Sequence, residues 1–220
     1  MKTKNIISLL VALIMCLSLA ACGSKSEAPV SEAVPTPAGS PIEAAPTPDA
    51  QPTEAPGSSE AEGSGTLIVY FSQTGNTQKV AELIAGNVEA DIFRIEPETP
   101  YTDDYNELLD VAQSEKSANA RPAIAGELAN LAAYDTVFLG WPCWWGTCPM
   151  IMLSFLEQYD LSGKTIVPFT TSGGSGFGTS LSDMQAVCTD ALWMDGLSVG
   201  DGSVDNAGDT VANWLIELGI

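Results

Sequence analysis

The chain has no histidine and very few basic residues. Histidine is absent from all 220 residues, and 8 Lys and Arg stand against 28 Asp and Glu, which gives a net charge of −20. Without histidine, Ser–His and Cys–His nucleophiles and Cys/His metal sites are excluded. Because contacts to nucleic-acid phosphates require clustered Lys and Arg, we expect no nucleic-acid partner.

Cysteine is also scarce. Two of the five cysteines lie near the N-terminus, and the other three are Cys143, Cys148 and Cys188. No pair has the close spacing of a zinc site, so we expect no metal. We expect unpaired small side chains, with Cys188 in a core. The alternative is a disulfide between Cys143 and Cys148, which an exported protein can form.

The N-terminus has the features of an export signal. Lys2 and Lys4 precede an apolar run over residues 6–19, and two alanines follow before Cys22. A basic start, an apolar stretch and small residues at its end are typical of a signal peptide, which here covers residues 1–21. The apolar run is shorter than the about 20 residues needed to span a bilayer, so a transmembrane helix is the weaker interpretation.

The end of this signal resembles the lipobox of bacterial lipoproteins, with the order Leu19, Ala20, Ala21, Cys22. The resemblance implies that Cys22 becomes the first mature residue and carries acyl chains. Several acyl chains anchor a protein firmly, whereas one chain holds it only marginally. We therefore expect an extracytoplasmic protein anchored to the cell membrane by lipid on Cys22. An ordinary signal peptide that ends near a cysteine is the alternative.

Residues 22–65 do not have the composition of a folded domain. They are rich in Ala, Pro, Ser, Thr, Glu and Gly and include eight prolines. Such a segment has too little apolar surface to offset the entropy lost on ordering, so we expect a disordered, extended tether. The folded domain is then expected over residues 66–220.

Strand and helix patterns alternate along this domain. Apolar runs predict strands, and apolar positions at helical spacing predict helices between them. The pattern predicts an α/β fold with a doubly wound, five-stranded parallel sheet in a three-layer α/β/α arrangement. The strands are expected at 66–71, 92–95, 136–140, 164–171 and within 191–199, with helices at 76–87, from 149, from 180 and at 211–218, and an amphipathic stripe at 105–112.

Two positions raise local questions. Pro168 lies inside the fourth expected strand, although proline is normally excluded from central strands. Ser180 and Asp183 have the spacing of a capping box, which predicts that Ser180 caps the following helix.

Ligands of doubly wound sheets bind at the carboxyl ends of the strands, so the loops there are candidate sites. The loop after the first strand leads into a helix and has three hydroxyls, one glycine and no cation. Helix N-terminal amides and hydroxyls can bind phosphate without Lys or Arg, and Gly75 lets the backbone curve closely around it. A polar helix cap is the alternative. The candidate residues are Ser72, Gln73, Thr74, Gly75, Asn76 and Thr77.

The loop after the third strand is rich in tryptophan, from Trp141 to Thr147. Dense aromatic residues at a sheet edge suit stacking on a flat conjugated ring, and a buried aromatic cluster is the alternative. The candidate residues are Pro142, Cys143, Trp144, Trp145 and Gly146.

The loop after the fourth strand is rich in glycine. Its backbone N–H and C=O groups can approach the edge of a ring and form hydrogen bonds with it, because glycine has no side chain to intervene. A flexible surface loop is the alternative. The candidate residues are Thr171, Ser172, Gly173, Gly174 and Gly176.

Together these loops resemble the flavodoxin family, and the resemblance extends over residues 66–220. It depends on the Ser-x-Thr-Gly-Asn-Thr order at 72–77 and on the segments 140–147 and 169–176. It implies noncovalent FMN, with 72–77 at the phosphate, Trp144 to Gly146 beside the isoalloxazine ring and Thr171 to Gly176 at its far edge. No catalytic residue is implied, because the flavin carries the redox chemistry.

The resemblance implies extracytoplasmic electron transfer with redox partner proteins or small electron acceptors. One alternative is an NAD(P)H-dependent quinone or flavin reductase of the same fold, and another is a binding module that has lost flavin. From residue 66 onward, 21 acidic side chains stand against five basic ones. This excess of negative charge disfavours added electrons, so we expect a low reduction potential.

Lipidation at Cys22 can be tested directly. Cys22→Ser removes the expected acyl site, and we expect the protein to move from the membrane fraction to the soluble fraction of fractionated cells. Immunoblotting of both fractions measures this, and an unchanged distribution would contradict the lipid anchor.

Overall fold

The structure is a computed structural model, and it describes residues 65–220. The expected signal peptide, Cys22 and all but the last residue of the expected tether lie outside the described residues. Within residues 65–220, none of the helices is both long enough and apolar enough to cross a membrane.

A parallel sheet runs through the centre of the domain, in the order β2-β1-β5-β6, with β7 and β8 both paired to the far side of β6. The order reverses between β1 and β5, which is the pattern of a doubly wound sheet and confirms the expected fold class. The strands are β1 (Thr66–Tyr70), β2 (Asp91–Arg94), β5 (Thr136–Pro142), β6 (Thr165–Ser172), β7 (Leu192–Trp193) and β8 (Leu197–Gly200).

Helices cover both faces of the sheet. Alternate strand residues pack to opposite sides, so that Leu67 and Val69 contribute to one buried cluster, and Ile68 and Tyr70 to the other. The first cluster includes residues of α3 and α4, and the second includes residues of α1 and α5. These helices are α1 (Asn76–Ala85), α3 (Met150–Gln158), α4 (Ser180–Val187) and α5 (Gly208–Leu218).

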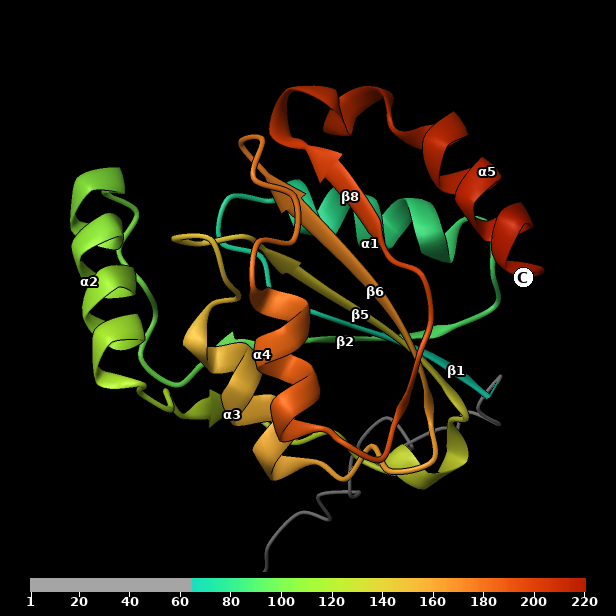
Figure 1. The fold of residues 1–220 in the computed structure, drawn as a ribbon, viewed down its shortest axis with the longest axis horizontal. Helices are drawn as coiled ribbons and strands as arrows, with labels where there is room; N and C mark the ends of the chain where they lie inside the picture. Colours follow the sequence, from blue (N-terminus) through green and yellow to red (C-terminus); the bar gives the residue numbers. More distant parts are fainter. Residues whose placement is uncertain (1–64) are drawn as a thin grey trace, which may run out of the picture. The chain divides into compact units, whose positions relative to one another are not determined.

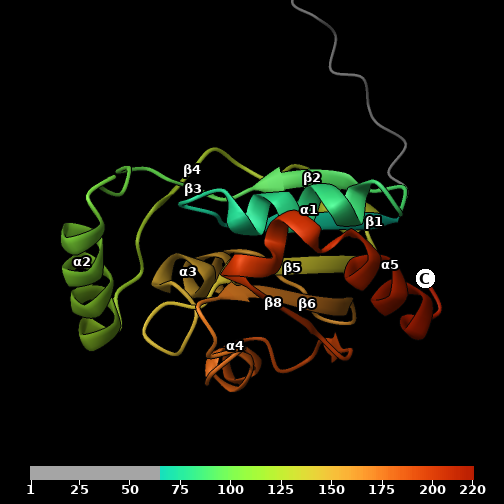
Figure 2. The same cartoon turned by 90° about the horizontal axis from the view of Figure 1, so that it is seen from above.

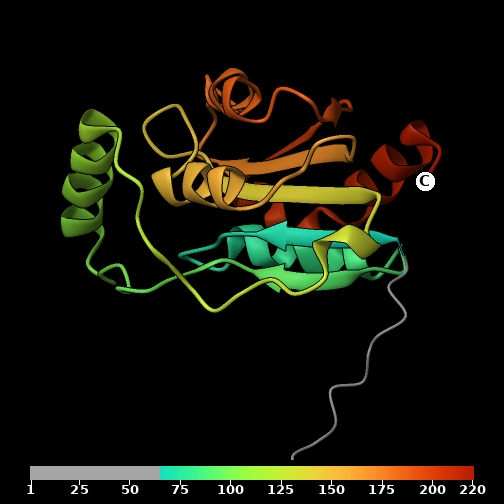
Figure 3. The ribbon, with the colours of Figure 1, turned by 90° about the horizontal axis from the view of Figure 1, so that it is seen from below.

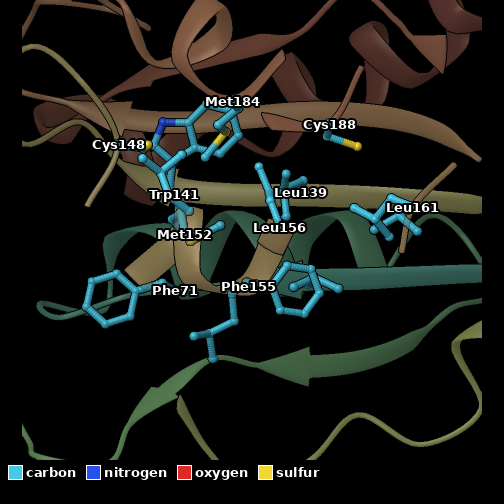
Figure 4. Close-up of a cluster of buried hydrophobic side chains, with 14 of the residues drawn as sticks. Phe71, Leu139, Trp141, Cys148, Met152, Phe155, Leu156, Leu161, Met184 and Cys188 are labelled. Atoms are coloured by element: carbon cyan, nitrogen blue, oxygen red, sulfur yellow. The ribbon is translucent and has the colours of Figure 1, made fainter. Parts of the chain in front are cut away.

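The larger cluster fixes the carboxyl end of β5. Trp141 is fully buried there and lies in β5, not in the loop where the sequence pattern grouped it (Figure 4). Its indole Nε1 donates to Ser180 Oγ at 3.1 Å, so α4 is tied to the strand by a buried hydrogen bond. Cys188 is also in this cluster, as expected.

This bond explains why the expected capping box at Ser180 is wrong. Thr179 is the N-cap of α4, and Ser180 is its buried first residue. The Ser180 hydroxyl donates to the Phe177 carbonyl while it accepts from Trp141, because a buried indole N–H needs an acceptor. Asp183 instead accepts from Thr179 Oγ1 at 2.7 Å.

The fifth expected strand is split into β7 and β8, and the gap between them lies opposite Pro168 of β6. Thr165 and Ile166 pair with β7, and Phe169 to Ser172 pair with β8, so residues 167 and 168 have no partner on that side. The ladder to β5 is continuous and includes Pro168. Because proline has no N–H to donate, it is tolerated where the ladder to the fifth strand is interrupted.

The long connection between β2 and β5 carries a further helix. In Figure 1 the arrows of β5 and β6 point toward the side where α2 (Tyr105–Ala118) lies, and Figures 2 and 3 show α2 at that end of the domain, where it contacts α3. The Asp104 carboxylate caps α2 by accepting from the amides of Asn106 and Glu107. The rest of the connection contains the antiparallel pair β3 (Glu96–Pro97) and β4 (Ile124–Ala125), and the 3₁₀ helix η1 (Leu131–Ala133).

Candidate functional site

The three candidate loops meet at the carboxyl edge of the sheet. Tyr70 pairs with Gly140, and Pro142 pairs with Thr171, so the strands end side by side. A cavity of about 330 Å³, which we call the edge cavity, opens between the loops. Eight of the candidate residues line it: Thr74, Pro142, Cys143, Trp144, Trp145, Thr171, Ser172 and Gly173.

The first loop ends in a helix start that has no side-chain cap. Gly75 is the N-cap of α1, with φ 89°, and no side chain accepts from the first turn. The first amides of a helix have no intrahelical partner, so this turn presents unpaired N–H groups and the positive end of the helix dipole. Ser72 Oγ accepts from Gly75 N at 3.2 Å and holds the loop in shape. The local chemistry is that of an anion site.

The remaining residues of this loop tie it to its neighbours. Thr77 is buried, and its hydroxyl lies 2.9 Å from the hydroxyl of Thr171 on β6. Gln73 donates to the carbonyl of Thr102 at 3.3 Å, before α2. Asn76 donates to Asp201 Oδ1 at 3.3 Å. Thus Gln73, Asn76 and Thr77 reach three other segments and do not line the edge cavity.

Arg94 braces the loop from β2, and no sequence pattern indicated this role. Its guanidinium donates to the Ser72 carbonyl at 3.1 Å and to Gln78 Oε1 at 3.2 Å, and it pairs with Glu96 at 2.7 Å. Lys79, in the first turns of α1, is paired with Asp205. These nearby cations have carboxylate partners, so positive potential in the loop comes from backbone amides.

The second loop is a tight hairpin turn. Trp144 and Thr147 exchange two backbone hydrogen bonds, at 2.8 and 3.0 Å. The two residues between them, Trp145 and Gly146, have φ values of 51° and 76°. Positive φ at both central positions defines a type I′ turn, which favours Asn or Gly and is strained for tryptophan.

The turn sends its two tryptophans into different surroundings. The Trp144 ring meets Phe71 and Tyr101 edge-to-face, with centroid distances of 5.5 and 5.4 Å, and so extends the core to the cavity wall. Trp145 is 48% exposed. Both rings line the edge cavity, and Trp145 is the ring with free surface.

The third loop folds around one hydroxyl. Ser172 Oγ accepts from the amides of Gly174 and Gly176, at 3.3 and 3.0 Å. Both glycines have positive φ, which L side chains rarely adopt. Gly174 and Gly176 shape the loop but do not line the edge cavity.

The second and third loops are locked together. Thr179 N donates to the Gly146 carbonyl at 2.8 Å, and a Cβ on Gly178 would lie 2.1 Å from that oxygen. Asp183 Oδ2 accepts from the hydroxyls of Thr147, at 2.5 Å, and Thr179, at 2.7 Å. Gly146 therefore supports the site through its carbonyl and does not line the cavity.

The three cysteines of the described region are unpaired. Burial raises the pKa of the Cys148 thiol to about 12, so it stays protonated. Cys143 lines the edge cavity and its sulfur accepts from Ser175 Oγ at 3.3 Å. The alternative of a Cys143–Cys148 disulfide is therefore not observed.

Five further residues line the edge cavity without having been candidates. Four belong to the apolar stripe of α2, which the sequence pattern predicted without assigning it to the site. The fifth is Asp201, in the 3₁₀ helix η2 (Asp201–Asn206), and no sequence pattern indicated it. They are Tyr105, Leu108, Leu109, Ala112 and Asp201.

A comparison with protein families shows to which family the chain belongs. Residues 65–218 match the family model described as Flavodoxin. The chain belongs to the flavodoxin family. Family membership supports FMN as the cofactor expected from the sequence. None of the curated proteins compared with the chain matches it.

Solved flavoprotein structures resemble the flavodoxin domain. A putative flavoprotein from Bacteroides eggerthii is 36% identical, with TM-score 0.57, over 67% of this chain and 97% of its own. A putative flavoprotein from Bacteroides uniformis is 34% identical, with TM-score 0.62, over 68% and 96%. A flavoprotein from Lactobacillus acidophilus in complex with FMN shares the fold at 24% identity, with TM-score 0.55, over 64% and 96%.

Beside the site, Glu115 of α2 is a half-buried carboxylate that accepts from Tyr101 Oη at 3.0 Å. Burial raises the pKa of Glu115, and the hydrogen bond from Tyr101 only partly offsets this. A raised pKa in the folded state means that Glu115 stabilises the fold when protonated and that this contribution is lost as pH rises through the raised pKa.

Glu115→Gln should therefore raise the melting temperature at pH 7, by about 2 °C for a gain of roughly 0.5–1 kcal/mol in a domain of this size. The difference should shrink as the pH falls and the wild-type carboxyl takes up its proton. Thermal unfolding at pH 7 and at lower pH values measures it. Asp110→Asn, which removes an exposed charge from the same helix, is the control, and an equal effect of both variants would contradict the role of burial.

Proposed function

We propose that this flavodoxin domain binds FMN noncovalently and transfers electrons outside the cytoplasm, anchored by lipid on Cys22. The observation that carries the proposal is the uncapped N-terminus of α1 beside the edge cavity. An anion receptor and a largely apolar cavity adjoin at the end of one sheet, as a phosphate ester with an attached ring requires.

The first loop fits a phosphate. Unpaired amides at the start of α1 supply hydrogen-bond donors. The hydroxyls of Thr74 and Thr77 belong to the same loop and helix start. The loop has no cation, yet helix N-termini bind phosphate through amides and the helix dipole. Ser72 and Arg94 hold the loop in place, so little ordering is needed on binding.

The edge cavity fits a flat conjugated ring. Its volume of about 330 Å³ lies at the small end of ligand pockets, and its walls are mostly apolar or aromatic. Trp145 offers an exposed ring surface, and Thr171 to Gly173 also line the cavity. When bound, the flavin supplies the redox chemistry, and the protein positions it and sets its electrostatic surroundings.

Charge at the cavity favours an electron carrier over the NAD(P)H-dependent reductase. Among the described residues that line the edge cavity, Asp201 alone is charged. With the amides at the start of α1 taken by the FMN phosphate, the phosphates of a nicotinamide dinucleotide would meet Asp201 as the charged group of the lining. Redox proteins and uncharged small acceptors meet no such penalty. The intact first loop also disfavours a module that has lost flavin.

Removing hydroxyls from the first loop tests FMN binding. We expect the double variant Thr74→Val, Thr77→Val to raise the Kd for FMN about 10- to 100-fold, because hydrogen bonds to a charged group are worth roughly 1.5–3 kcal/mol. Titration of flavin fluorescence measures the Kd. Thr170→Val removes another buried hydroxyl, which donates to the Trp141 carbonyl, and is the matched control. Unchanged FMN affinity in the double variant would contradict the assignment.

Steady-state kinetics distinguishes the carrier from the reductase. With NADPH and a quinone but no partner protein, we expect the FMN-loaded protein to show no sustained turnover. Many turnovers per flavin would instead support the reductase. A colourless protein after loading with FMN and dialysis would favour the module without flavin.

A further inference from the structure

The buried side chains of helix α2 line the edge cavity. Leu108 and Ala112 are the buried residues among its 14, and they lie one turn apart on the same face. Both line the edge cavity, together with Tyr105 and Leu109. The apolar stripe that a surface helix normally packs on a core here faces the space between the loops.

Two hydrogen bonds fasten α2 to the tip of the Trp145 turn. Trp145 Nε1 donates to the Leu109 carbonyl at 3.1 Å, and Lys116 Nζ donates to the Trp145 carbonyl at 2.7 Å. Leu109 and Lys116 are seven residues apart, which is about two helical turns, so the Trp145 loop contacts two successive turns on one face of α2. Trp145 therefore sets the position of α2 relative to the second loop.

A neighbouring face of α2 meets the connection that precedes the helix, where Tyr101 Oη donates to Glu115 at 3.0 Å and Thr102 Oγ1 donates to Glu107 at 2.9 Å. A second cavity of about 400 Å³ lies there, lined by residues that include Tyr101, Val111 and Pro122. Val111 is 38% exposed. This face contributes hydrogen bonds and a cavity, so the apolar packing of α2 comes from the face that carries Leu108 and Ala112.

The strained backbone of Trp145 is consistent with this arrangement. A tryptophan with φ 51° costs free energy that the surrounding structure must offset. The two bonds to α2 involve both the indole and the carbonyl of this residue. The strained backbone conformation therefore orients Trp145 so that it links the second loop to α2.

We propose that α2 is the outer wall of the flavin site, where Leu108 and Ala112 pack against the isoalloxazine ring and Trp145 fixes the position of the helix. This inference rests on the proposed binding of FMN. The edge cavity has a volume of about 330 Å³, and α2 supplies the apolar surface on the side away from the sheet. Ring binding and the ordering of α2 are then coupled.

Hydrogen exchange of the unaltered, intact protein tests the coupling. We expect FMN to slow amide exchange in residues 105–118, whereas inorganic phosphate slows it only around residues 72–77. FMN binding with unchanged exchange in α2 would overturn this inference and leave the proposed function standing. Failure of the unaltered protein to bind FMN would overturn both.

Matched substitutions on one helix test the contact. Leu108→Ala should raise the Kd for FMN about tenfold, because it removes methylene groups from a ligand pocket. Val111→Ala, which faces the second cavity, should leave the Kd unchanged. Equal affinities of the two variants would overturn the contact between Leu108 and the ring.

The link through Trp145 has its own control. Trp145→Phe keeps a ring but removes the N–H that bonds to Leu109, and we expect it to speed amide exchange in residues 105–118 of the FMN complex at least several-fold. Trp193→Phe removes an indole N–H that donates to the Cys188 carbonyl at 3.4 Å, on the far part of the sheet, and should have no such effect. Unchanged exchange in Trp145→Phe would contradict its role in positioning α2.

Discussion

The site depends on one electrostatic constraint: an acidic domain must hold an anion with backbone amides. From residue 66 onward the chain has 21 acidic and five basic side chains, and Lys79 and Arg94 near the first loop are paired with carboxylates. Gly75 leaves the start of α1 uncapped, so its amides remain available. A side-chain cap there would occupy the donors that the proposed phosphate site uses.

Because amides are fixed by the backbone, the surrounding loops must be rigid. Thr77 and Thr171 join the first loop to β6, and Asp183 joins the second loop to the start of α4. Gly178 allows the closest approach between these segments. Rigid supports of this kind reduce the free energy that binding spends on ordering. The helix α2 is held differently: Trp145 and Lys116 link it to the second loop, and Tyr101 and Thr102 donate to its carboxylates.

The sequence predicted the elements whose signals are local. Apolar runs such as 66–71 indicated buried parallel strands, and the loops after them were correctly placed at one edge because parallel strands end together. Asp201, Arg94 and the inner face of α2 were missed because their roles arise only when distant segments meet. Ser180 was assigned wrongly for the same reason: the partner that decides its hydrogen bonds, Trp141, lies 39 residues away.

The break opposite Pro168 has a consequence for how copies of the domain behave together. The sheet ends there in β7 and β8, of two and four residues, with an interruption between them. An edge of this kind offers no long row of free N–H and C=O groups on which another chain could add a strand. This edge of the domain therefore contributes little to sheet-to-sheet aggregation when copies are crowded together.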